Sequence, residues 1–348
     1  MPNHVINKIC MQGDPKEIQS MLEKIKNDEF GIGTVDFDKI IPMPKSLDIE
    51  SGTRTENGLK AYRQFIELYT FGKTVKDAQK ALPNIPLESE NAFLCQRPDI
   101  SREEWDLGKA AWHNLQNYGA ATWYDWCIGN WATKWNAYGY EKGVDYSGND
   151  NLCFRTAWSA PHPVLDKLSE MYPEIVMEHR WADEDIGCNC GQRTWLGGKI
   201  IDEYIPEEVR AKDFAMEMWG YEPAELGLCL NASGTGYIYV DDTDFETIEL
   251  LGHSALFTNE RLTREDIPQG MYCYHLRHGN DGQFCTVEPR VNANHGGSVI
   301  TKEPIDFGKE GYIPFTEETS PNFTGESMTL EEFMQEQSPQ ESEVMELC

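Results

Sequence analysis

The stretch WDLGKAAWHNLQNYGAATWYDWCIGNWATKW, residues 105–135, contains six of the ten tryptophans of the chain. All ten lie between Trp105 and Trp219. Each tryptophan can bury about 150–250 Å² of surface. The stretch is therefore expected to form a packed core of the N-terminal part. The alternative is an exposed aromatic surface that stacks on bases or rings.

The composition indicates a folded protein with two or three domains. The chain has 348 residues, of which 40% are hydrophobic and 11% aromatic. No apolar run approaches the roughly 18 residues of a membrane span. The start, Met1-Pro2-Asn3-His4, lacks the features of a secretory signal, which favours a cytoplasmic location. The ten cysteines are expected to be reduced thiols.

The chain is strongly acidic, with a net charge of −29. Nine glutamates lie in residues 317–348, which leaves −20 on residues 1–316. Such a surface repels phosphate backbones, so direct nucleic-acid binding is not expected. It favours a protein partner with a basic surface, while improved solubility is the simpler alternative. The charge indicates nothing about oligomeric state.

Hydrophobic periodicity predicts two β-α-β units. In the first, a strand over residues 4–11 precedes a helix that Asp14 caps, and Thr34–Ile41 alternates as a strand. In the second, a strand and a helix lead to the alternating residues 175–181. Together they predict an α+β fold, a ferredoxin-like split β-α-β sandwich of four antiparallel strands with two helices on one face. A tryptophan-rich helical insertion, at about residues 55–147, separates the halves.

Short sequence motifs predict the structure of the rest of the chain. Ser101-Arg102-Glu103-Glu104 is a capping-box pattern that begins a helix, and Gly197-Gly198 indicates a two-residue hairpin turn. Short strand candidates separated by Gly, Asn and Asp predict a small, mostly β C-terminal domain. The expected organisation is a ferredoxin-like domain at 1–225, a linker at 226–245, a β-rich domain at 246–333 and an acidic disordered tail at 334–348.

Two clusters of acidic, cysteine or histidine residues could bind a metal ion. Asp183, Glu184 and Asp185 precede the Cys-x-Cys pair in residues 188–190, but their spacing does not fit a metal site, and an acidic strand end followed by a glycine-rich turn is the preferred explanation. A zinc site is conceivable across a C-terminal hairpin, from Cys273, His275, His278 and Cys285. No cofactor and no catalytic residue is predicted.

A binding surface is the other candidate site. It would use the faces of the tryptophan stretch together with the acidic strand end. Its predicted residues are Trp126, Asn130, Trp131, Lys134, Trp135, Trp158, Arg180, Asp183, Glu184 and Asp185.

Several stretches resemble a known family. They are Met1–Val5, Trp123-Tyr124-x-Trp126, Asn130–Trp135, Thr156–Pro161 and Ala182–Gly191. Residues 1–205 resemble the YubB-type ferredoxin-like family of phages, plasmids and integrative elements, although Ala132 replaces a glycine that is usual in that family. The C-terminal part resembles a domain associated with large polyvalent proteins of mobile elements. The resemblance implies a fold and a mobile-element setting and supplies no catalytic residues.

Three functions remain open. The leading hypothesis is a non-catalytic acidic interaction protein of a bacterial mobile element or phage, which counters host defence by binding a protein. The second is a small-molecule or nucleotide-binding protein. The third is a metal-dependent enzyme.

Overall fold

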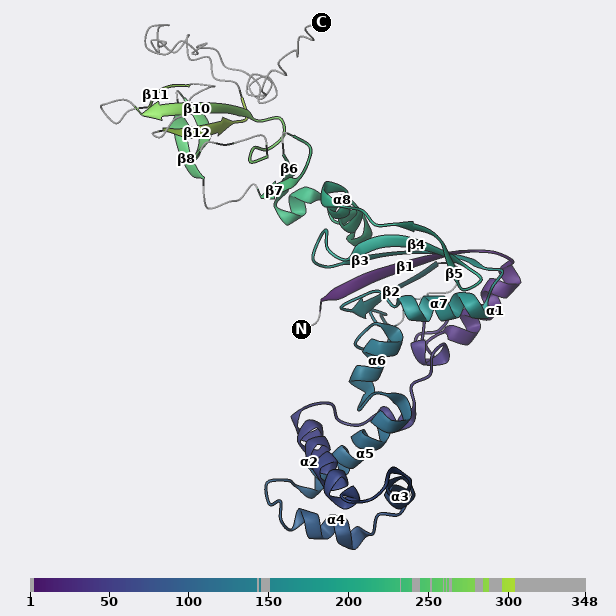
Figure 1. The fold of residues 1–348 in the computed structure, drawn as a ribbon. Coiled ribbons are helices and arrows are strands. Elements are labelled where there is room, and N and C mark those ends of the chain that lie inside the picture. The colour runs from purple at the N-terminus through teal and green to yellow at the C-terminus, as the bar shows by residue number, and fades with distance from the viewer. Residues whose placement is uncertain are drawn as a thin grey trace, which may run out of the picture. The chain divides into compact units, whose positions relative to one another are not determined.

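The computed structural model describes residues 3–142, 144, 151–231, 233–239, 245–250, 252–258, 260, 262, 265–278, 284–287 and 296–303. The chain divides into two compact units, Met1–Pro206 and Glu207–Cys348 (Figure 1). The division expected from the sequence, with a first domain at 1–225 and a linker at 226–245, stays a prediction.

The first unit is built on a five-stranded antiparallel sheet in the order β2-β1-β3-β4-β5. The strands are β1 (His4–Gln12), β2 (Asn151–Ala157), β3 (Val176–Asp183), β4 (Cys190–Leu196) and β5 (Lys199–Tyr204). β1 lies between β2 and β3, and helix α7 (His162–Met171) connects those two strands. This is a split β-α-β arrangement, so the predicted α+β, ferredoxin-like class is confirmed.

Two helices cover one face of this sheet (Figure 1). Helix α1 (Pro15–Ile25) begins at Asp14, whose Oδ1 accepts hydrogen bonds from the backbone N–H groups of Lys16 and Glu17 at 2.9 and 3.2 Å. Its apolar side chains and those of α7 pack against alternate residues of the strands. The buried set is Ile9, Met11, Ile18, Met21, Leu22, Ile25, Leu152, Phe154, Val164, Leu165, Leu168, Met177 and Trp195.

The strand predicted at Thr34–Ile41 is wrong. The chain forms a short 3-10 helix there, η1 (Phe37–Lys39), which Asp36 caps. The apolar residues are buried as expected, but the backbone N–H of Val35 donates to the Tyr140 hydroxyl at 3.0 Å. That of Phe37 donates to Asn136 Oδ1 at 2.8 Å. Side chains about 100 residues away thus take the hydrogen bonds that a neighbouring strand would have made, and the first predicted β-α-β unit does not form.

The hairpin between β4 and β5 is confirmed. Leu196 pairs with Lys199, and Gly197 and Gly198 have φ values of 60° and 73°. Two successive positive φ values match the twist of a two-residue turn, and glycine adopts them without steric cost. The hairpin adds β4 and β5 beside β3, so the sheet has five strands where the sequence predicted four.

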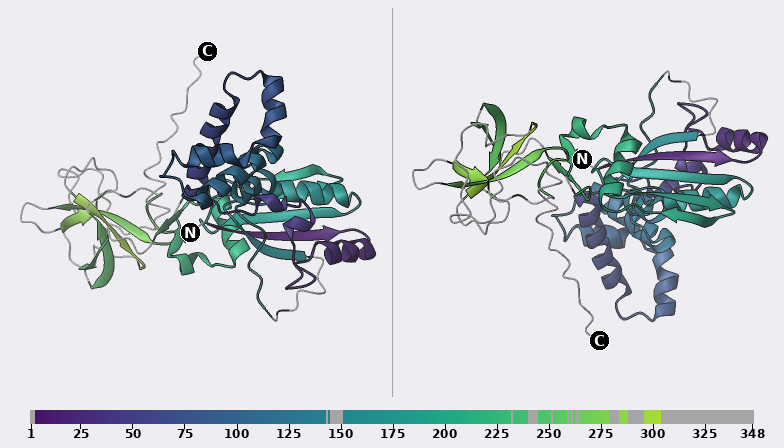
Figure 2. Two further views of the ribbon diagram at one scale, coloured as in Figure 1. Left: turned by 90° about the horizontal axis from the view of Figure 1, so that it is seen from below. Right: turned by 90° about the horizontal axis from the view of Figure 1, so that it is seen from above.

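The helical insertion between β1 and β2 comprises η2 (Lys45–Leu47), α2 (Thr53–Thr70), α3 (Val75–Ala81), η3 (Leu82–Asn84), α4 (Leu87–Leu94), α5 (Arg102–Tyr118) and α6 (Trp123–Trp131). Ser101 and Glu104 form the predicted capping box at the start of α5. Helices α2, α4 and α5 pack together, and the insertion extends away from the sheet (Figures 1 and 2). Gly58 of α2 meets Gly108 of α5 where the helices cross.

The tryptophan stretch supplies two separate cores. Trp105 is fully buried in the insertion and packs on Tyr62 with ring centroids 5.1 Å apart. Its Nε1 donates to Oε2 of the buried Glu90 at 3.1 Å. Trp126 and Trp131 are buried in the core beneath the sheet. The expected packed core is therefore present, although its tryptophans do not share one centre.

The second unit begins with α8 (Glu208–Trp219) and η4 (Pro223–Leu226). A small hairpin, β6 (Leu228–Leu230) and β7 (Tyr237–Tyr239), lies within the predicted linker. Five further strands form an antiparallel sheet in the order β11-β10-β12-β9-β8. They are β8 (Glu246–Leu250), β9 (His253–Thr258), β10 (Tyr272–His278), β11 (Phe284–Val287) and β12 (Gly296–Thr301). The predicted tail at 334–348 lies outside the described residues.

Candidate functional site

The stretches on which the family resemblance rests meet at one end of the first sheet. His4 pairs with Ala157, and Val5 pairs with Asp183, so the start of β1 lies between the ends of β2 and β3. Asn3 Nδ2 donates to Asp183 Oδ1 at 3.2 Å. The antiparallel pairing brings these distant segments together, because the start of one strand lies beside the end of its antiparallel neighbour.

Trp158 projects from this end with an unusual backbone. Its φ is 75°, a left-handed value that is an outlier for a bulky residue. Its N–H donates to the Asn3 carbonyl at 3.0 Å, and its carbonyl accepts from Asn189 Nδ2 at 3.1 Å. The side chain is nevertheless 40% exposed. A strained, exposed aromatic residue that its neighbours hold in place is typical of a binding site.

Lys134 lies between two tryptophan rings beside this residue. Its Nζ is 4.7 Å from the ring centroid of Trp135 and 5.1 Å from that of Trp158. Tyr124 meets Trp158 edge-on, with centroids 6.1 Å apart. Lys134 forms no ion pair with any carboxylate in the described part of the chain. Three of the predicted binding residues, Lys134, Trp135 and Trp158, are thus brought together.

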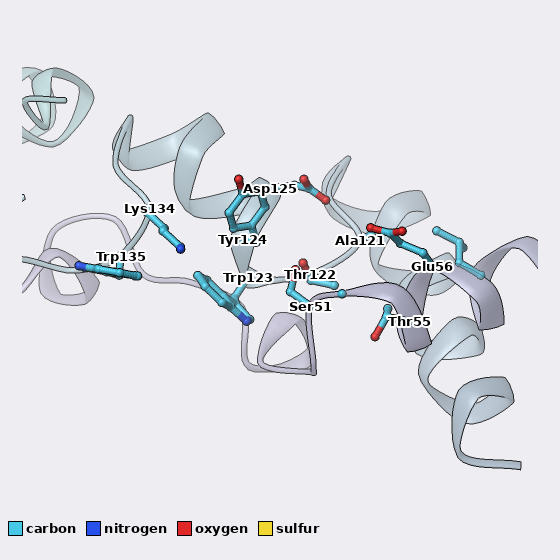
Figure 3. A pocket seen from close by; sticks show the side chains of 12 residues that line it. Ser51, Thr55, Glu56, Ala121, Thr122, Trp123, Tyr124, Asp125, Lys134 and Trp135 are labelled. Atoms are coloured by element: carbon cyan, nitrogen blue, oxygen red, sulfur yellow. The ribbon is translucent and has the colours of Figure 1, made fainter. Parts of the chain in front are cut away.

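A cavity of about 660 Å³ opens beside these residues, and we call it the Lys134 pocket (Figure 3). The first turns of α2 and α6 and the segment that follows α6 form its walls. Its volume is in the range of about 300–1,000 Å³ that small-molecule sites occupy. The lining residues are Ser51, Gly52, Thr55, Glu56, Leu59, Ala121, Thr122, Trp123, Tyr124, Asp125, Lys134 and Trp135.

Most of the pocket wall was not predicted from the sequence. Thr122 is the N-cap residue of α6, yet its side chain caps no backbone N–H. The residue is 4% exposed, and its buried Oγ1 has no hydrogen-bond partner. The pattern Thr122-Trp123-Tyr124-Asp125 resembles a helix start and could have located α6. Nothing local in the sequence indicates that this turn faces the start of α2.

Other predicted residues of the tryptophan stretch have structural roles. Trp131 is 3% exposed, and its Nε1 donates to the Ile41 carbonyl at 2.9 Å. Trp126 meets Trp131 edge-on at 5.4 Å, and Asn130 Nδ2 donates to the Trp126 carbonyl at 2.9 Å. Ala132 ends α6 with a φ of 62°, which explains why glycine suits that position. These side chains build the helix and core that carry Lys134.

The acidic strand end forms a turn outside the pocket lining. Asp183 is buried, and its Oδ1 accepts from the backbone N–H of Asp185 at 2.9 Å. Glu184 and Asp185 are exposed. The turn ends at Asn189, whose side chain holds Trp158. The acidic turn therefore supports the aromatic site through the backbone of Trp158. Arg180 lies within β3, between Lys8 of β1 and Gln192 of β4.

Only part of the predicted zinc site lies among the residues that the structure describes. Cys273 is fully buried in an apolar cluster, and burial raises the pKa of its thiol to about 12. The side chains of His275, His278 and Cys285 fall outside the described residues. Among the side chains that are described, including Asp183, Glu184 and Asp185, no group of three His, Cys, Asp or Glu residues is arranged to hold a metal ion.

The described fold defines a mixed α+β protein with a ferredoxin-like domain. Residues 130–222 match a family model described as a ferredoxin-like domain in Api92-like protein. Residues 241–335 match the model of large polyvalent protein associated domain 28. The ferredoxin-like class and the C-terminal resemblance predicted from the sequence are both confirmed. The ferredoxin-like match begins at Asn130, so it includes Lys134, Trp135 and Trp158.

Among solved structures, the chain is similar to the crystal structure of the protein api92 from Yersinia pseudotuberculosis. The two share 11% sequence identity with a TM-score of 0.30, and the similarity covers 59% of this chain and 98% of that one. No curated protein matches the chain. In the described part of the chain, no helix has both the length and the apolar character needed to cross a membrane.

Proposed function

We propose that this chain is a binding protein whose ligand occupies the Lys134 pocket. The observation that carries the proposal is the lysine itself. What distinguishes Lys134 from the exposed lysines of the chain is its surroundings, two tryptophan rings at the edge of a cavity. Its Nζ lies over Trp135 and Trp158 and forms no ion pair among the described residues. A partly desolvated ammonium beside aromatic faces is suited to bind an anionic ligand that carries a flat ring.

The pocket proposal predicts ligand-dependent stabilisation. A ligand present at 100 times its Kd adds about 2.7 kcal/mol to the free energy of unfolding. For a unit of this size that raises Tm by about 5–10 °C. The measurement is a thermal-shift screen of nucleotides, signalling dinucleotides and sugar phosphates. At least one compound is expected to stabilise the wild type, and Lys134→Gln should remove most of the shift.

The matched control for this screen is Lys199→Gln, since Lys199 is an exposed lysine of β5 outside the pocket lining. It should keep the full shift. A panel in which no compound stabilises the wild type contradicts the proposal. So does a compound whose shift is the same in Lys134→Gln and the wild type.

We propose, as a second candidate, that the chain is a non-catalytic acidic interaction protein of a bacterial phage or other mobile element. Two observations support it: the net charge of −29, and the match of residues 241–335 to a domain of large polyvalent proteins. The resemblance to the YubB-type family adds the mobile-element setting. In this proposal the acidic surface binds a basic host protein and so counters host defence in the cytoplasm.

Salt dependence tests the second candidate. The full chain, immobilised in bacterial lysate at about 50 mM salt, should capture a basic protein that about 500 mM salt releases, because salt screens exposed charge pairs. The captured protein should then bind the purified chain with the same dependence. Failure to capture any protein at low salt contradicts this candidate, and so does binding that does not respond to salt. The Lys134→Gln variant separates it from the pocket proposal, since removing that lysine should leave charge-driven capture intact.

A further inference from the structure

The Lys134 pocket has two chemically different ends (Figure 3). Lys134 and Trp135 lie at one end, and the carboxylates of Glu56 and Asp125 lie toward the other. Trp123 and Tyr124 lie between them. An occupant that fills this pocket therefore meets a cation, then aromatic surface, then two acceptor groups.

The acidic end is suited to hydrogen-bond donors. Glu56 and Asp125 are exposed, and each lies in the first turn of its helix, α2 or α6. Neither carboxylate forms an ion pair or hydrogen bond with another described residue. Both are therefore available to accept hydrogen bonds from amino or hydroxyl groups of a ligand.

Thr122 provides a separate sign that the pocket is built for an occupant. Its hydroxyl belongs to a residue that is 4% exposed, lines the pocket and has no partner for Oγ1. An unsatisfied buried hydroxyl destabilises a folded protein, and valine would fill the same space without that cost. Threonine at this position is explained if a ligand atom completes the hydrogen bond.

We infer that the occupant is a nucleoside monophosphate, an inference that rests on the proposed binding function of this pocket. The phosphate binds Lys134, the base lies on the aromatic surface of Trp123 and Tyr124, and amino or hydroxyl groups donate to Glu56 and Asp125. A ligand that is anionic throughout would be repelled at the acidic end. An uncharged aromatic amine would leave Lys134 without a partner. The single lysine also favours one phosphate over three, because each added phosphate brings further negative charge.

Calorimetric titration of the full chain tests this assignment. The probes are the four ribonucleoside 5′-monophosphates, their nucleosides and triphosphates, inorganic phosphate and a 5′-phosphorylated single-stranded oligonucleotide. At least one monophosphate should bind about tenfold or more tightly than its nucleoside, as expected for a charge-assisted hydrogen bond. It should also bind more tightly than its triphosphate and than inorganic phosphate. Tighter binding of the oligonucleotide would assign the same chemistry to a strand end instead of a free nucleotide and overturn the inference.

Three variants locate the parts of the ligand. Lys134→Gln should weaken the monophosphate about tenfold or more and leave the nucleoside unchanged. Asp125→Asn should weaken both to a similar extent. Thr122→Val should raise Tm without ligand by about 2 °C or more and yet weaken binding, a combination that a purely structural role does not produce.

The outcomes separate this inference from the function on which it rests. If another compound of the screen stabilises the wild type through Lys134 while no monophosphate binds, the pocket binds a ligand and the nucleotide inference is wrong. If the monophosphate and its nucleoside bind equally, the phosphate assignment is wrong. If no compound binds at all, both the inference and the pocket proposal fail.

Discussion

Alanine at position 58 or 108 is expected to force α2 away from α5 and to destabilise the helical insertion. A Cβ atom at Gly58 would lie 1.7 Å from the carbonyl oxygen of Glu104, and one at Gly108 would lie 1.9 Å from the carbonyl carbon of Gly58. The obstacles are backbone atoms, so no side-chain rotation relieves them. We expect a loss of at least about 3 kcal/mol, the upper part of the range for overpacked cores.

Thermal unfolding followed by tryptophan fluorescence measures this effect, because Trp105 lies in the affected core beside Tyr62. At 2–4 °C for each kcal/mol, Tm of the insertion should fall by about 6–12 °C. Gly129→Ala is the matched control: a Cβ at Gly129, in α6, meets no atom within 4 Å. It should leave Tm unchanged or raise it, since alanine favours a helix by up to about 1 kcal/mol over glycine. Equal Tm values for Gly58→Ala and the wild type would show that the crossing is not close-packed.

Mild acid is expected to destabilise the first unit through two buried histidines. His162 of α7 and His179 of β3 have ring centroids 5.7 Å apart, and Trp181 packs against both rings. Burial lowers the pKa of His162 to about 4, with a smaller contribution from the positive charge of Arg193 that Glu203 opposes. Burial, followed by the positive charges of His162 and Arg193, also lowers the pKa of His179 well below its usual value.

The direction in which stability changes with pH follows from the lowered pKa values of the two histidines. The folded state keeps both rings neutral, whereas in the unfolded chain the histidines bind protons near their ordinary pKa of 6.5. The stability that depends on these rings is complete above pH 6.5 and is lost as the pH falls toward about 4. For His162 alone the full difference corresponds to about 3 kcal/mol. Protonation of His179 in addition would leave a second charge buried beside the first.

Denaturant unfolding at a series of pH values between about 7.5 and 4.5 measures this loss. The window stays above the range in which most carboxylates bind protons. His162→Gln removes one of the two titrating rings and should flatten the dependence of the unfolding free energy on pH. The prediction would be wrong if the variant and the wild type lost stability in parallel over this interval.

Elements whose signals are local were predicted well. Asp14 at the start of α1, the capping box of α5 and Gly197-Gly198 between β4 and β5 each act over a few residues. Their hydrogen bonds and φ angles depend on neighbours in the chain, so they can be recognised without the rest of the fold. The alternation of residues in β2 and β3 likewise predicted one split β-α-β unit correctly.

The segment at Thr34–Ile41 shows why the remainder could not be predicted. Apolar and polar residues alternate in this segment, and its apolar residues Val35 and Phe37 are buried. A strand also needs a backbone partner, and here the partners are the side chains of Asn136 and Tyr140. Hydrophobic pattern specifies which side chains are buried but does not specify which group takes a backbone hydrogen bond.

For the candidate site, the sequence by itself determined the residue types and their place at the end of a helical insertion. It singled out Lys134, Trp135 and Trp158, but also Trp126 and Trp131, which are buried. Only the tertiary structure decided which rings remain exposed and that Glu56 and Thr122 share a pocket with Lys134 and Trp135. The physical reason is that exposure and convergence arise when segments distant in the chain pack against each other. The starts of α2 and α6 meet at the pocket, and the pairing of β1 with β2 and β3 places Trp158.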